Sequence, residues 1–270
     1  MPLVKTQQII DQQGFTLAVN VILLEHAEAY VQAAEELGKG LVVQLSENTI
    51  NYHGHLAPVG KALIEMAASS KQPIAVHLDH ATSPDLVRKA VDLGFSSVMF
   101  DGSNLDYAAN VATTRQLVQE VSSKVWFEAE LGEVGGKDGV HAPGVRTKPA
   151  EAASFVAETG VHGLAVAVGS SHAMLDKSSE LDFDLISQLR EAVGVPLVLH
   201  GSSGVSHLDL REAISAGIKK INIATELNVV FNDVIKQHIA EGPGDPRKFL
   251  IPAREALKNH VVFLHKTLAG

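Results

Sequence analysis

Short, almost continuous apolar runs alternate with longer amphipathic segments along the whole chain. The runs are rich in Val, Ile, Leu and Ala, which is typical of parallel strands covered on both faces. We count eight such runs, at residues 16–22, 40–46, 73–80, 96–103, 125–132, 163–169, 196–201 and 219–225. The pattern therefore predicts eight parallel strands.

The segments between the runs carry helix signals. Residues 83–93 read SPDLVRKAVDL, with Ser83 as an N-cap, Pro84 at the first helical position and Gly94 as a C-cap. Comparable helices are predicted at residues 27–37, 148–159, 184–193 and 208–216. Strand and helix alternating eight times favours a closed (β/α)8 TIM barrel. An open, doubly wound sheet is the alternative, but no glycine-rich turn follows the first run.

Two more helices are predicted beyond the eighth run, at residues 226–241 and 251–268, with EGPGDPRK between them. We expect this C-terminal helical extension to pack on the barrel or on a neighbouring subunit, in a homodimer or homotetramer. No linker divides the chain, so residues 1–270 are predicted to form a single barrel domain. Residues 133–147 (EVGGKDGVHAPGVRT) follow no pattern, and we expect a mobile, functional loop there.

Composition narrows the classes of function. The chain has 270 residues, 46% of them hydrophobic and none of them Cys, so zinc would need His and carboxylate ligands. The net charge of −9, with scattered Lys and Arg, argues against nucleic acid as a partner. The N-terminus has no apolar core of a signal peptide, and no later stretch reaches roughly 18 apolar residues, which argues against a membrane. We expect a cytoplasmic protein.

Polar side chains gather where the apolar runs end, and in such barrels the active site lies at the C-terminal ends of the strands. His80 ends the third run, His172 follows the sixth, and His200 ends the seventh. Three imidazoles with an open fourth position are typical of a catalytic zinc site. A single histidine at a barrel rim is more often only a hydrogen-bonded side chain. Three of them, with carboxylates at the same ends, favour bound Zn²⁺.

The other histidines are less informative. His53 and His55 are expected in a loop or in the wall of a substrate cavity, and His77 is expected to face the barrel interior. The remaining ones are interpreted as surface or helix residues, namely His162, His207, His238, His260 and His265.

A small-residue turn follows the seventh run, and its neighbours end the eighth. Barrels most often bind phosphate in this region, through backbone N–H groups and a helix N-terminus. The predicted phosphate-binding residues are Gly201, Ser202, Ser203, Asn222, Ala224 and Thr225. A flexible turn is the alternative interpretation of GSSG, and the position in the barrel favours phosphate.

Taken together, the strand-end motifs resemble those of the class II, metal-dependent ketose-bisphosphate aldolases. That family contains fructose-1,6-bisphosphate and tagatose-1,6-bisphosphate aldolases. The matching motifs are AVNV (18–21), QLSENT (44–49), HLDH (77–80), DGS (101–103), EAELG (128–132), GSSH (169–172), VLHGSSG (198–204) and KINIATE (220–226). They occur in order over nearly the entire chain, so the resemblance is more specific than any one motif.

The resemblance implies a role for each matching position. His80, His172 and His200 match zinc ligands, and Asp79 matches the acid/base group that exchanges a proton with the C4 hydroxyl. The other matches are Gly201 and Ser203 for the phosphate of the dihydroxyacetone phosphate half, Asn222 and Thr225 for that same half, Asn20 and Ser46 for further substrate contacts, and Asp101 and Glu130 for carboxylates beside the metal.

Several departures from the family pattern concern the substrate. Ala173 stands where many relatives have a Gly that helps to form the phosphate site and a site for a monovalent cation, Na⁺ or K⁺. The eighth run ends NIAT rather than NIDT, which resembles the tagatose-type branch. The long loop reads GGKDG, one residue short of the form that carries a catalytic glutamate, so Asp138 or Glu133 is expected to replace it. Arg247, contributed by a neighbouring subunit, is the candidate cation for a second phosphate.

The expected reaction is the zinc-dependent, reversible cleavage of a phosphorylated ketose to dihydroxyacetone phosphate and an aldehyde. A metal-free aldolase would need a barrel lysine for a Schiff base. No run ends in Lys, and Lys219 and Lys220 are expected at the opposite face of the barrel. Two alternatives stay open: another metal-dependent barrel enzyme acting on phosphosugars, such as an epimerase, and a non-catalytic sugar-phosphate sensor.

Overall fold

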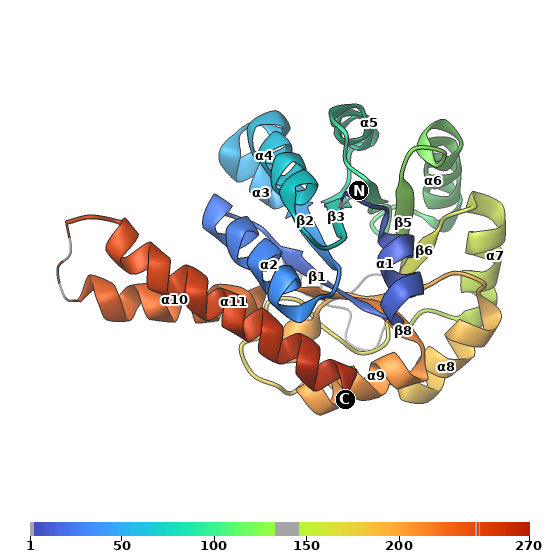
Figure 1. Ribbon diagram of the computed structural model, residues 1–270. Coiled ribbons are helices and arrows are strands. Elements are labelled where there is room, and N and C mark those ends of the chain that lie inside the picture. The colour runs from blue at the N-terminus through green and yellow to red at the C-terminus, as the bar shows by residue number, and fades with distance from the viewer. Residues whose placement is uncertain (1–2, 133–145, 241, 243) are drawn as a thin grey trace.

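The structure is a computed structural model that describes residues 3–132, 146–240, 242 and 244–270. Within them, eight parallel strands close a barrel in the order β1 to β8, with helices around it (Figure 1). The strands are β1 (Thr16–Asn20), β2 (Leu41–Ser46), β3 (Ile74–Ala81), β4 (Ser97–Phe100), β5 (Trp126–Leu131), β6 (Gly163–Val166), β7 (Leu197–Leu199) and β8 (Ile218–Ile223). The predicted (β/α)8 TIM barrel is confirmed, and each predicted run contains or overlaps one strand.

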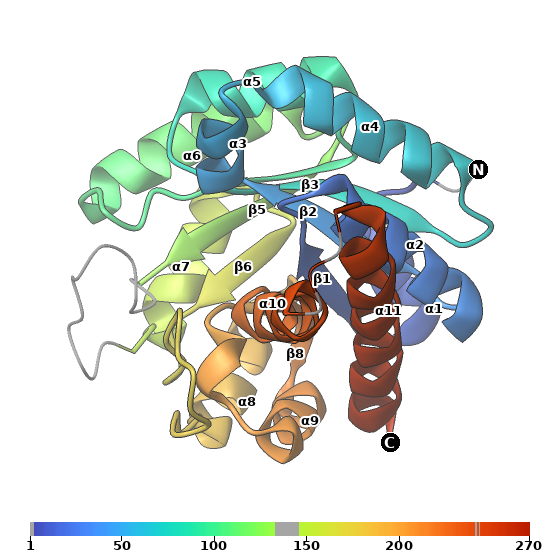
Figure 2. The same cartoon turned by 90° about the vertical axis from the view of Figure 1, so that its left-hand side faces the viewer.

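The helices form a ring outside the strands, which the view turned by 90° shows clearly (Figure 2). They are α1 (Thr6–Gln13), α2 (Leu24–Leu37), α3 (Glu47–His53), α4 (Leu56–Ser69), α5 (Pro84–Leu93), α6 (Tyr107–Val121), α7 (Pro149–Thr159), α8 (Phe183–Ala192), α9 (His207–Ala216), α10 (Thr225–Ile239) and α11 (Arg247–Ala269), with a short 3-10 helix η1 (Ser202–Gly204). The sequence patterns did not identify α1, α3, α4 or α6. Helix α4 carries Pro58 and Gly60 in its first turns, and both weaken a helix signal.

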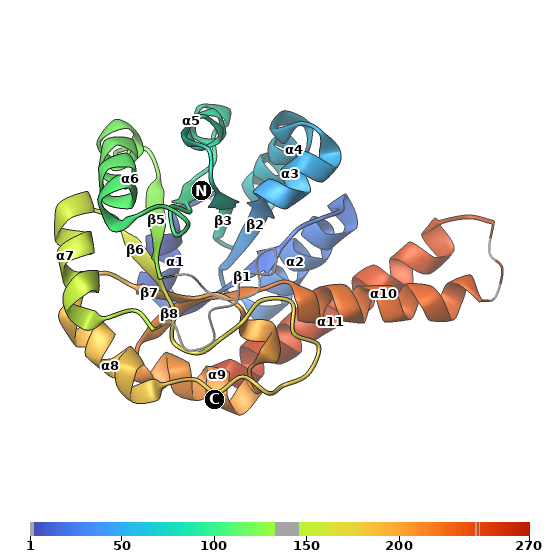
Figure 3. The same ribbon diagram turned by 180° about the vertical axis from the view of Figure 1, so that it is seen from behind.

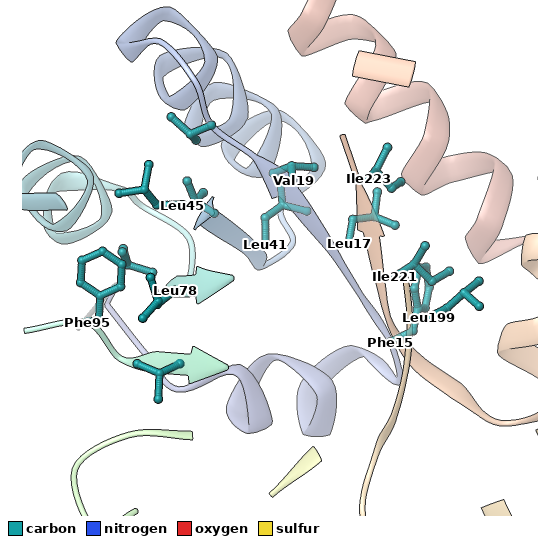
Figure 4. Close-up of a cluster of buried hydrophobic side chains, with 14 of the residues drawn as sticks. Phe15, Leu17, Val19, Leu41, Leu45, Leu78, Phe95, Leu199, Ile221 and Ile223 are labelled. Carbon is teal, nitrogen blue, oxygen red and sulfur yellow. The ribbon is translucent and has the colours of Figure 1, made fainter. Parts of the chain in front are cut away.

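Large apolar side chains of the strands point outward and pack against the helices. Leu17 and Val19 of β1, Leu41 of β2 and Leu78 of β3 are fully buried in this layer, part of which Figure 4 shows. Because side chains alternate along a strand, the residues between them point into the barrel. The outward layer is the main hydrophobic core of the protein.

Most of the inward-pointing side chains are small or polar, and one large apolar side chain, Trp126, packs among small ones. Near the N-terminal ends of the strands, Ile9 of α1 packs with Ala18, Val42 and Ala75, and closes the bottom of the barrel. Higher in the barrel, the inward positions carry buried charged and amide groups instead of a second apolar layer. The polar groups thus lie at the end where barrels of this type place their active sites.

Helices α10 and α11 pack side by side as an antiparallel hairpin, one end of which projects away from the barrel (Figure 3). The other part of α11 packs on α2 and α9. The predicted helical extension is confirmed, although α11 begins at Arg247, four positions before the predicted 251, and contains Pro252. Among the described residues, no helix has both the length and the apolar character that a membrane crossing requires.

Candidate metal centre and substrate cavity

Three histidines from different strand ends meet at the top of the barrel. His80 is the second-last residue of β3, His172 follows β6, and His200 directly follows β7. Their ring centroids are 4.5 Å (His80–His200), 5.3 Å (His80–His172) and 6.0 Å (His172–His200) apart. One ligand atom of each lies within 4.8 Å of the other two. The structure thus brings together the three residues that the sequence proposes as metal ligands.

The backbone of β3 is irregular at His80. Its register with β4 shifts between Leu78 and Ala81, and His80 has a φ of 50°, in the left-handed region that non-glycine residues rarely adopt. Bulges at barrel rims re-aim side chains, and strained backbone gathers at functional sites. The irregularity explains how Asp79 and His80, which are neighbours in sequence, both serve the same site.

Two carboxylates lie beside the histidines. Asp101 Oδ2 is 2.9 Å from His80 Nδ1, and Glu130 Oε2 is 3.8 Å from the same nitrogen and 3.4 Å from His200 Nδ1. Asp101 Oδ1 accepts hydrogen bonds from the backbone N–H and hydroxyl of Ser103. His80, Asp101 and Glu130 form a second group whose ligand atoms lie within 4.8 Å. Two overlapping donor sets therefore share His80.

His200 is held from below by Glu128. Its Nε2 is 2.9 Å from Glu128 Oε1, and both side chains are fully buried. This contact leaves Nδ1, which faces Glu130, for a metal ion, and a carboxylate behind a ligating histidine is a common device for orienting it. Burial lowers the pKa of His200, but the contacts with Glu128 and Glu130 outweigh it and raise the pKa to about 9. Metal binding at Nδ1 would displace this proton.

Asp79 is buried beside the histidines with a donor on each oxygen. Gln44 Nε2 donates to Oδ2 at 3.1 Å, and Asn222 Nδ2 donates to Oδ1 at 3.0 Å. Burial raises the pKa of Asp79, but the positive charges of His80, His200 and Lys220 outweigh it, and the net pKa lies below the ordinary value. Each oxygen keeps a further acceptor position. Asp79 is therefore an ionised carboxylate that can still accept a proton.

A cavity of about 160 Å³ opens above these groups. Its lining is Asn20, Gln44, Ser46, Asn48, Asp79, His80, His172, Ala173, Gly201, Ser202, Ser203, Asn222, Ala224 and Thr225. The sequence did not identify Gln44 and Asn48. Gln44 was identifiable, because it stands two residues before Ser46 on one strand and so shares its face. Among the described residues, neither Asn20 Oδ1 nor Gln44 Oε1 has a hydrogen-bond partner, although both atoms are buried.

The predicted phosphate turn lies at one end of this cavity. Gly201 has a φ of 68°, and a Cβ at this position would come within 2.7 Å of the backbone of Ser171. Only glycine therefore lets the turn pack against the segment that carries His172. Ser203 Oγ accepts the backbone N–H of Met174 at 3.1 Å, and the hydroxyl of Ser202 donates to the carbonyl of Asn222. Ser202 thus turns its side chain away and can offer only its backbone.

Helix α10 begins at the same end of the cavity. Its N-cap is Ala224, whose side chain cannot accept a hydrogen bond, and Thr225 is its first residue. The first N–H groups of a helix have no partner within the helix and attract anions. The turn and the helix start thus form the kind of end that binds phosphate.

Several predicted residues lie elsewhere. Asp138 and Glu133 fall outside the described residues. Arg247 is 81% exposed at the start of α11, pairs with Asp245 at 2.7 Å, and is not among the residues that line the cavity. His53 ends α3, with Nε2 2.7 Å from the carbonyl of Ile22, and does not line the cavity either.

The predicted position of Lys220 is wrong. It points into the barrel interior and is fully buried, whereas the sequence placed it at the opposite face as the start of a strand. Strand β8 begins at Ile218, and the two-residue period puts Lys220 on the inward face with Asn222. The barrel therefore does contain a lysine. Its Nζ contacts Glu128 and Asn222, and it does not line the cavity, so its amine is not presented to a ketone.

The chain is similar to known aldolases over almost its full length. Residues 6–268 match the family described as Fructose-bisphosphate aldolase class-II. The YdjI aldolase of Escherichia coli K12 has 30% identity and a TM-score of 0.86, with 97% of this chain and 94% of that chain covered. A candidate fructose-1,6-bisphosphate aldolase of Coccidioides immitis has 28% identity and a TM-score of 0.87, with the same coverage.

The fructose-bisphosphate aldolase of Campylobacter jejuni, at 20% identity and a TM-score of 0.81, shares the fold over 98% of this chain and 95% of that one. Membership in an aldolase family favours the aldolase over the epimerase-type enzyme and the non-catalytic sensor. The strand-end histidines, the carboxylate beside them and the match over residues 6–268 lead to one conclusion: the chain belongs to the class II fructose-bisphosphate aldolase family and is an aldolase, a carbon–carbon lyase.

Proposed function

We propose that this aldolase catalyses the zinc-dependent, reversible cleavage of a phosphorylated ketose, of the tagatose- or fructose-1,6-bisphosphate type, to dihydroxyacetone phosphate and an aldehyde. The observation that carries the proposal is the meeting of His80, His172 and His200 beside the buried carboxylate of Asp79 at one cavity. The name of the Coccidioides immitis relative includes fructose-1,6-bisphosphate, which supports this class of substrate.

The residues fit a zinc ion. The chain has no Cys, and three imidazoles with a free fourth position are a common catalytic donor set for zinc. His80, His172 and His200 would hold the ion, with Asp101 and Glu130 as neighbouring carboxylates. When bound, the ion polarises the ketone oxygen and stabilises the negative charge that develops there, by several kcal/mol.

Asp79 is proposed as the proton carrier. Cleavage of the C3–C4 bond requires removal of the proton from the C4 hydroxyl, and Asp79 lines the cavity as an ionised carboxylate. Gln44 and Asn222 hold its two oxygens, so the carboxylate is oriented before the substrate arrives. A positioned acid/base group of this kind contributes about 10²–10⁴-fold to the rate.

The phosphate of the dihydroxyacetone phosphate half is proposed to bind at Gly201, Ser203 and the first turn of α10. Backbone N–H groups and the helix dipole provide the attraction there. Asn222 and Thr225 also line the cavity, as do Asn20 and Ser46, which are proposed to face the carbon chain of the substrate. Held at this end, the substrate would keep one pose while its reacting bond lies beside Asp79.

The tagatose-type substrate is the one we favour. Ala224 lines the cavity at the position where the NIDT form of the motif carries an aspartate. The methyl group of Ala224 makes no hydrogen bond to a sugar hydroxyl, so this chain would recognise the sugar differently from enzymes that carry the aspartate. Tagatose and fructose bisphosphates differ in configuration at a single carbon. A change at one cavity residue that contacts a single hydroxyl would be enough to distinguish them.

Further parts of the proposal concern the whole protein. We propose a single barrel domain and a homodimer or homotetramer, in which Arg247 of one subunit reaches the second phosphate bound by another. Asp138 or Glu133 is proposed to exchange the C3 proton. A Na⁺ or K⁺ ion near Ala173 is proposed to assist phosphate binding.

The test is a panel of phosphorylated ketoses assayed with the purified protein before and after treatment with a chelator. We expect cleavage of at least one bisphosphate, its loss on chelation, and its recovery with Zn²⁺. The metal content of His172→Ala should fall to the background level, while His55→Gln, a variant of an exposed histidine at the start of α4, should keep its metal. Cleavage that survives complete metal removal would exclude the proposed function.

A further inference from the structure

A fully buried ammonium group, that of Lys220, lies inside the barrel. Lys220 is 0% exposed, and its Nζ is 2.9 Å from Glu128 Oε2 and 2.7 Å from Asn222 Oδ1. It does not line the cavity, so it has no direct access to a substrate. A buried charge is costly unless its partners are well placed, and Lys220 has a carboxylate on one side and an amide oxygen on the other.

The contact with Asn222 determines which way its side-chain amide faces. An ammonium group only donates hydrogen bonds, so the amide oxygen must face Lys220. The amide nitrogen then faces Asp79, where Nδ2 donates to Oδ1 at 3.0 Å. In the flipped amide, N–H groups would face the ammonium and the oxygen would face the Asp79 carboxylate. Both contacts would be repulsive, so Lys220 selects the orientation that holds Asp79.

The contact with Glu128 leads to the histidines. Glu128 uses Oε2 for Lys220 and Oε1 for His200 Nε2, at 2.9 Å in each case. The same ammonium thus supports the carboxylate that orients His200 and the amide that orients Asp79. His200 follows β7 and Asp79 belongs to β3, which lie on different sides of the barrel.

We propose that Lys220 is a positioning residue of the aldolase reaction, which acts through Asn222 on the orientation of Asp79. The inference rests on the proposed function, because it takes Asp79 as the group that carries the proton. Charge balance for Glu128 is a separate, structural task of the same side chain. The two tasks are separable by experiment, because they run through different partners.

The first experiment compares Lys220→Met with the matched control Lys219→Met. Lys219 is the preceding residue of β8 and is only half-buried, on the other face of the strand. We expect kcat of Lys220→Met to fall about 10–100-fold, the range typical of residues that orient catalytic groups. KM should rise less than kcat falls, because Lys220 does not touch the substrate. Lys219→Met should match the wild type, and an unchanged kcat in Lys220→Met would overturn the proposal.

The second experiment separates positioning from charge balance. In Glu128→Gln/Lys220→Met both charges are removed together, and the Gln oxygen can still accept from His200. We expect its melting temperature to recover relative to Lys220→Met, which keeps the comparison possible if the single variant folds poorly. The kcat of the double variant should stay as low as that of Lys220→Met. If Lys220→Met does not fold, the kcat of the double variant should lie about 10–100-fold below that of Glu128→Gln. A kcat restored to the level of Glu128→Gln would assign Lys220 to charge balance alone.

A double-mutant cycle with Asn222→Ala tests the route through the amide. If Lys220 acts through Asn222, Lys220→Met should cost little more in kcat once Asn222 is Ala. Losses that simply multiply would contradict that route.

A crystal structure of Lys220→Met gives a readout that does not need turnover. We expect the Asn222–Asp79 hydrogen bond to be lost, and an intact bond would overturn the proposal. If the wild type cleaves no phosphorylated ketose, the proposed function fails, while this structural readout still decides the role of Lys220.

Discussion

The two faces of the same barrel strands have opposite chemistry. On β1, Leu17 points outward into an apolar layer, while Asn20 points inward and lines the cavity. On β3, Leu78 is outward and Asp79 is inward. The outward face provides the apolar burial that drives folding. The inward face carries the groups that we propose to react, and it contributes far less apolar burial.

The inward face is stable only because its charges are matched. Lys220 contacts Glu128, and Glu128 contacts His200. Asp79 accepts from Gln44 and Asn222. Removing one member of such a set leaves an uncompensated buried charge, which is strongly destabilising. The comparison therefore predicts that outward substitutions change stability alone, while inward substitutions change activity and, where they remove a buried charge, stability as well.

The largest expected effect is on the inward face. Asp79→Asn keeps the size of the side chain and removes its charge, so the C4 hydroxyl would lose the proton acceptor that we propose for it. We expect kcat to fall about 10²–10⁴-fold. Steady-state assays with the best ketose of the panel measure it.

Metal content serves as the control for Asp79→Asn and should stay close to the wild type, whereas the melting temperature should fall, because a buried charge that faces Lys220 and the histidines is removed. A variant that retains more than a tenth of wild-type kcat would show that another group carries the proton. The comparison between the two faces would then lose its strongest example.

The outward face should show the opposite behaviour. Leu17→Ala removes a fully buried side chain from the layer between strands and helices. We expect the free energy of unfolding to fall by about 2–5 kcal/mol, as for other buried Leu→Ala changes. Denaturant unfolding measures it, and kcat well below the melting temperature should stay within about twofold of the wild type.

The matched variant on the same strand is Asn20→Ala. Asn20 Oδ1 has no hydrogen-bond partner among the described residues, so stability should change little. KM should rise about tenfold, which corresponds to about 1.4 kcal/mol of lost substrate binding. If Leu17→Ala lowered kcat as much as Asn20→Ala raised KM, the division between the faces would be wrong.

The sequence predicted the strands and most of the cavity because both leave local signals. Apolar runs mark strands, and their polar ends mark the rim, which located His80, His200 and Asn222. It did not locate Lys220 or Gln44. Both lie inside a run, where only the two-residue alternation tells an inward residue from an outward one. That alternation was readable, because Gln44 stands two residues before Ser46 and Lys220 two residues before Asn222. The sequence does not show that Lys220 contacts Glu128, which depends on how the closed barrel brings the strands together.

Charged groups also lie outside the barrel, and one cluster between the helices allows the contribution of a charge to stability to be tested by changing the pH. Glu226 of α10 contacts Lys177 at 2.7 Å, His207 of α9 at 2.9 Å and His260 of α11 at 2.8 Å. Burial raises the pKa of Glu226, but hydrogen bonds from His260, Lys177 and His207 outweigh it and hold the pKa well below 4.5. A lowered carboxylate pKa stabilises the fold above the ordinary value, and this stabilisation is lost as the pH falls.

Glu226→Gln should therefore be less stable than the wild type at pH 7, by about 1–2 kcal/mol. The difference should shrink progressively below about pH 4.5, the ordinary pKa of the carboxyl group. Unfolding followed at several pH values measures it. A difference that stays constant from pH 7 to pH 3 would mean that the charge of Glu226 contributes nothing to this cluster.

The smallest expected effect concerns backbone strain beside the metal centre. Ala173 follows His172, lines the cavity and has a φ of 58°. This conformation costs a non-glycine residue about 1–2 kcal/mol in the folded state. Glycine removes that cost, but it also stabilises the unfolded state by about 0.4–1 kcal/mol through its greater conformational entropy. The free energy of unfolding of Ala173→Gly should therefore exceed that of the wild type by about 1 kcal/mol or less, and its melting temperature should be about 2 °C higher. The control Ala192→Gly, at the exposed end of α8, should lower it. A lowered melting temperature in Ala173→Gly would mean that the backbone at Ala173 is not strained. The rim of the barrel would then resemble the outward face, where the native residues stabilise the fold.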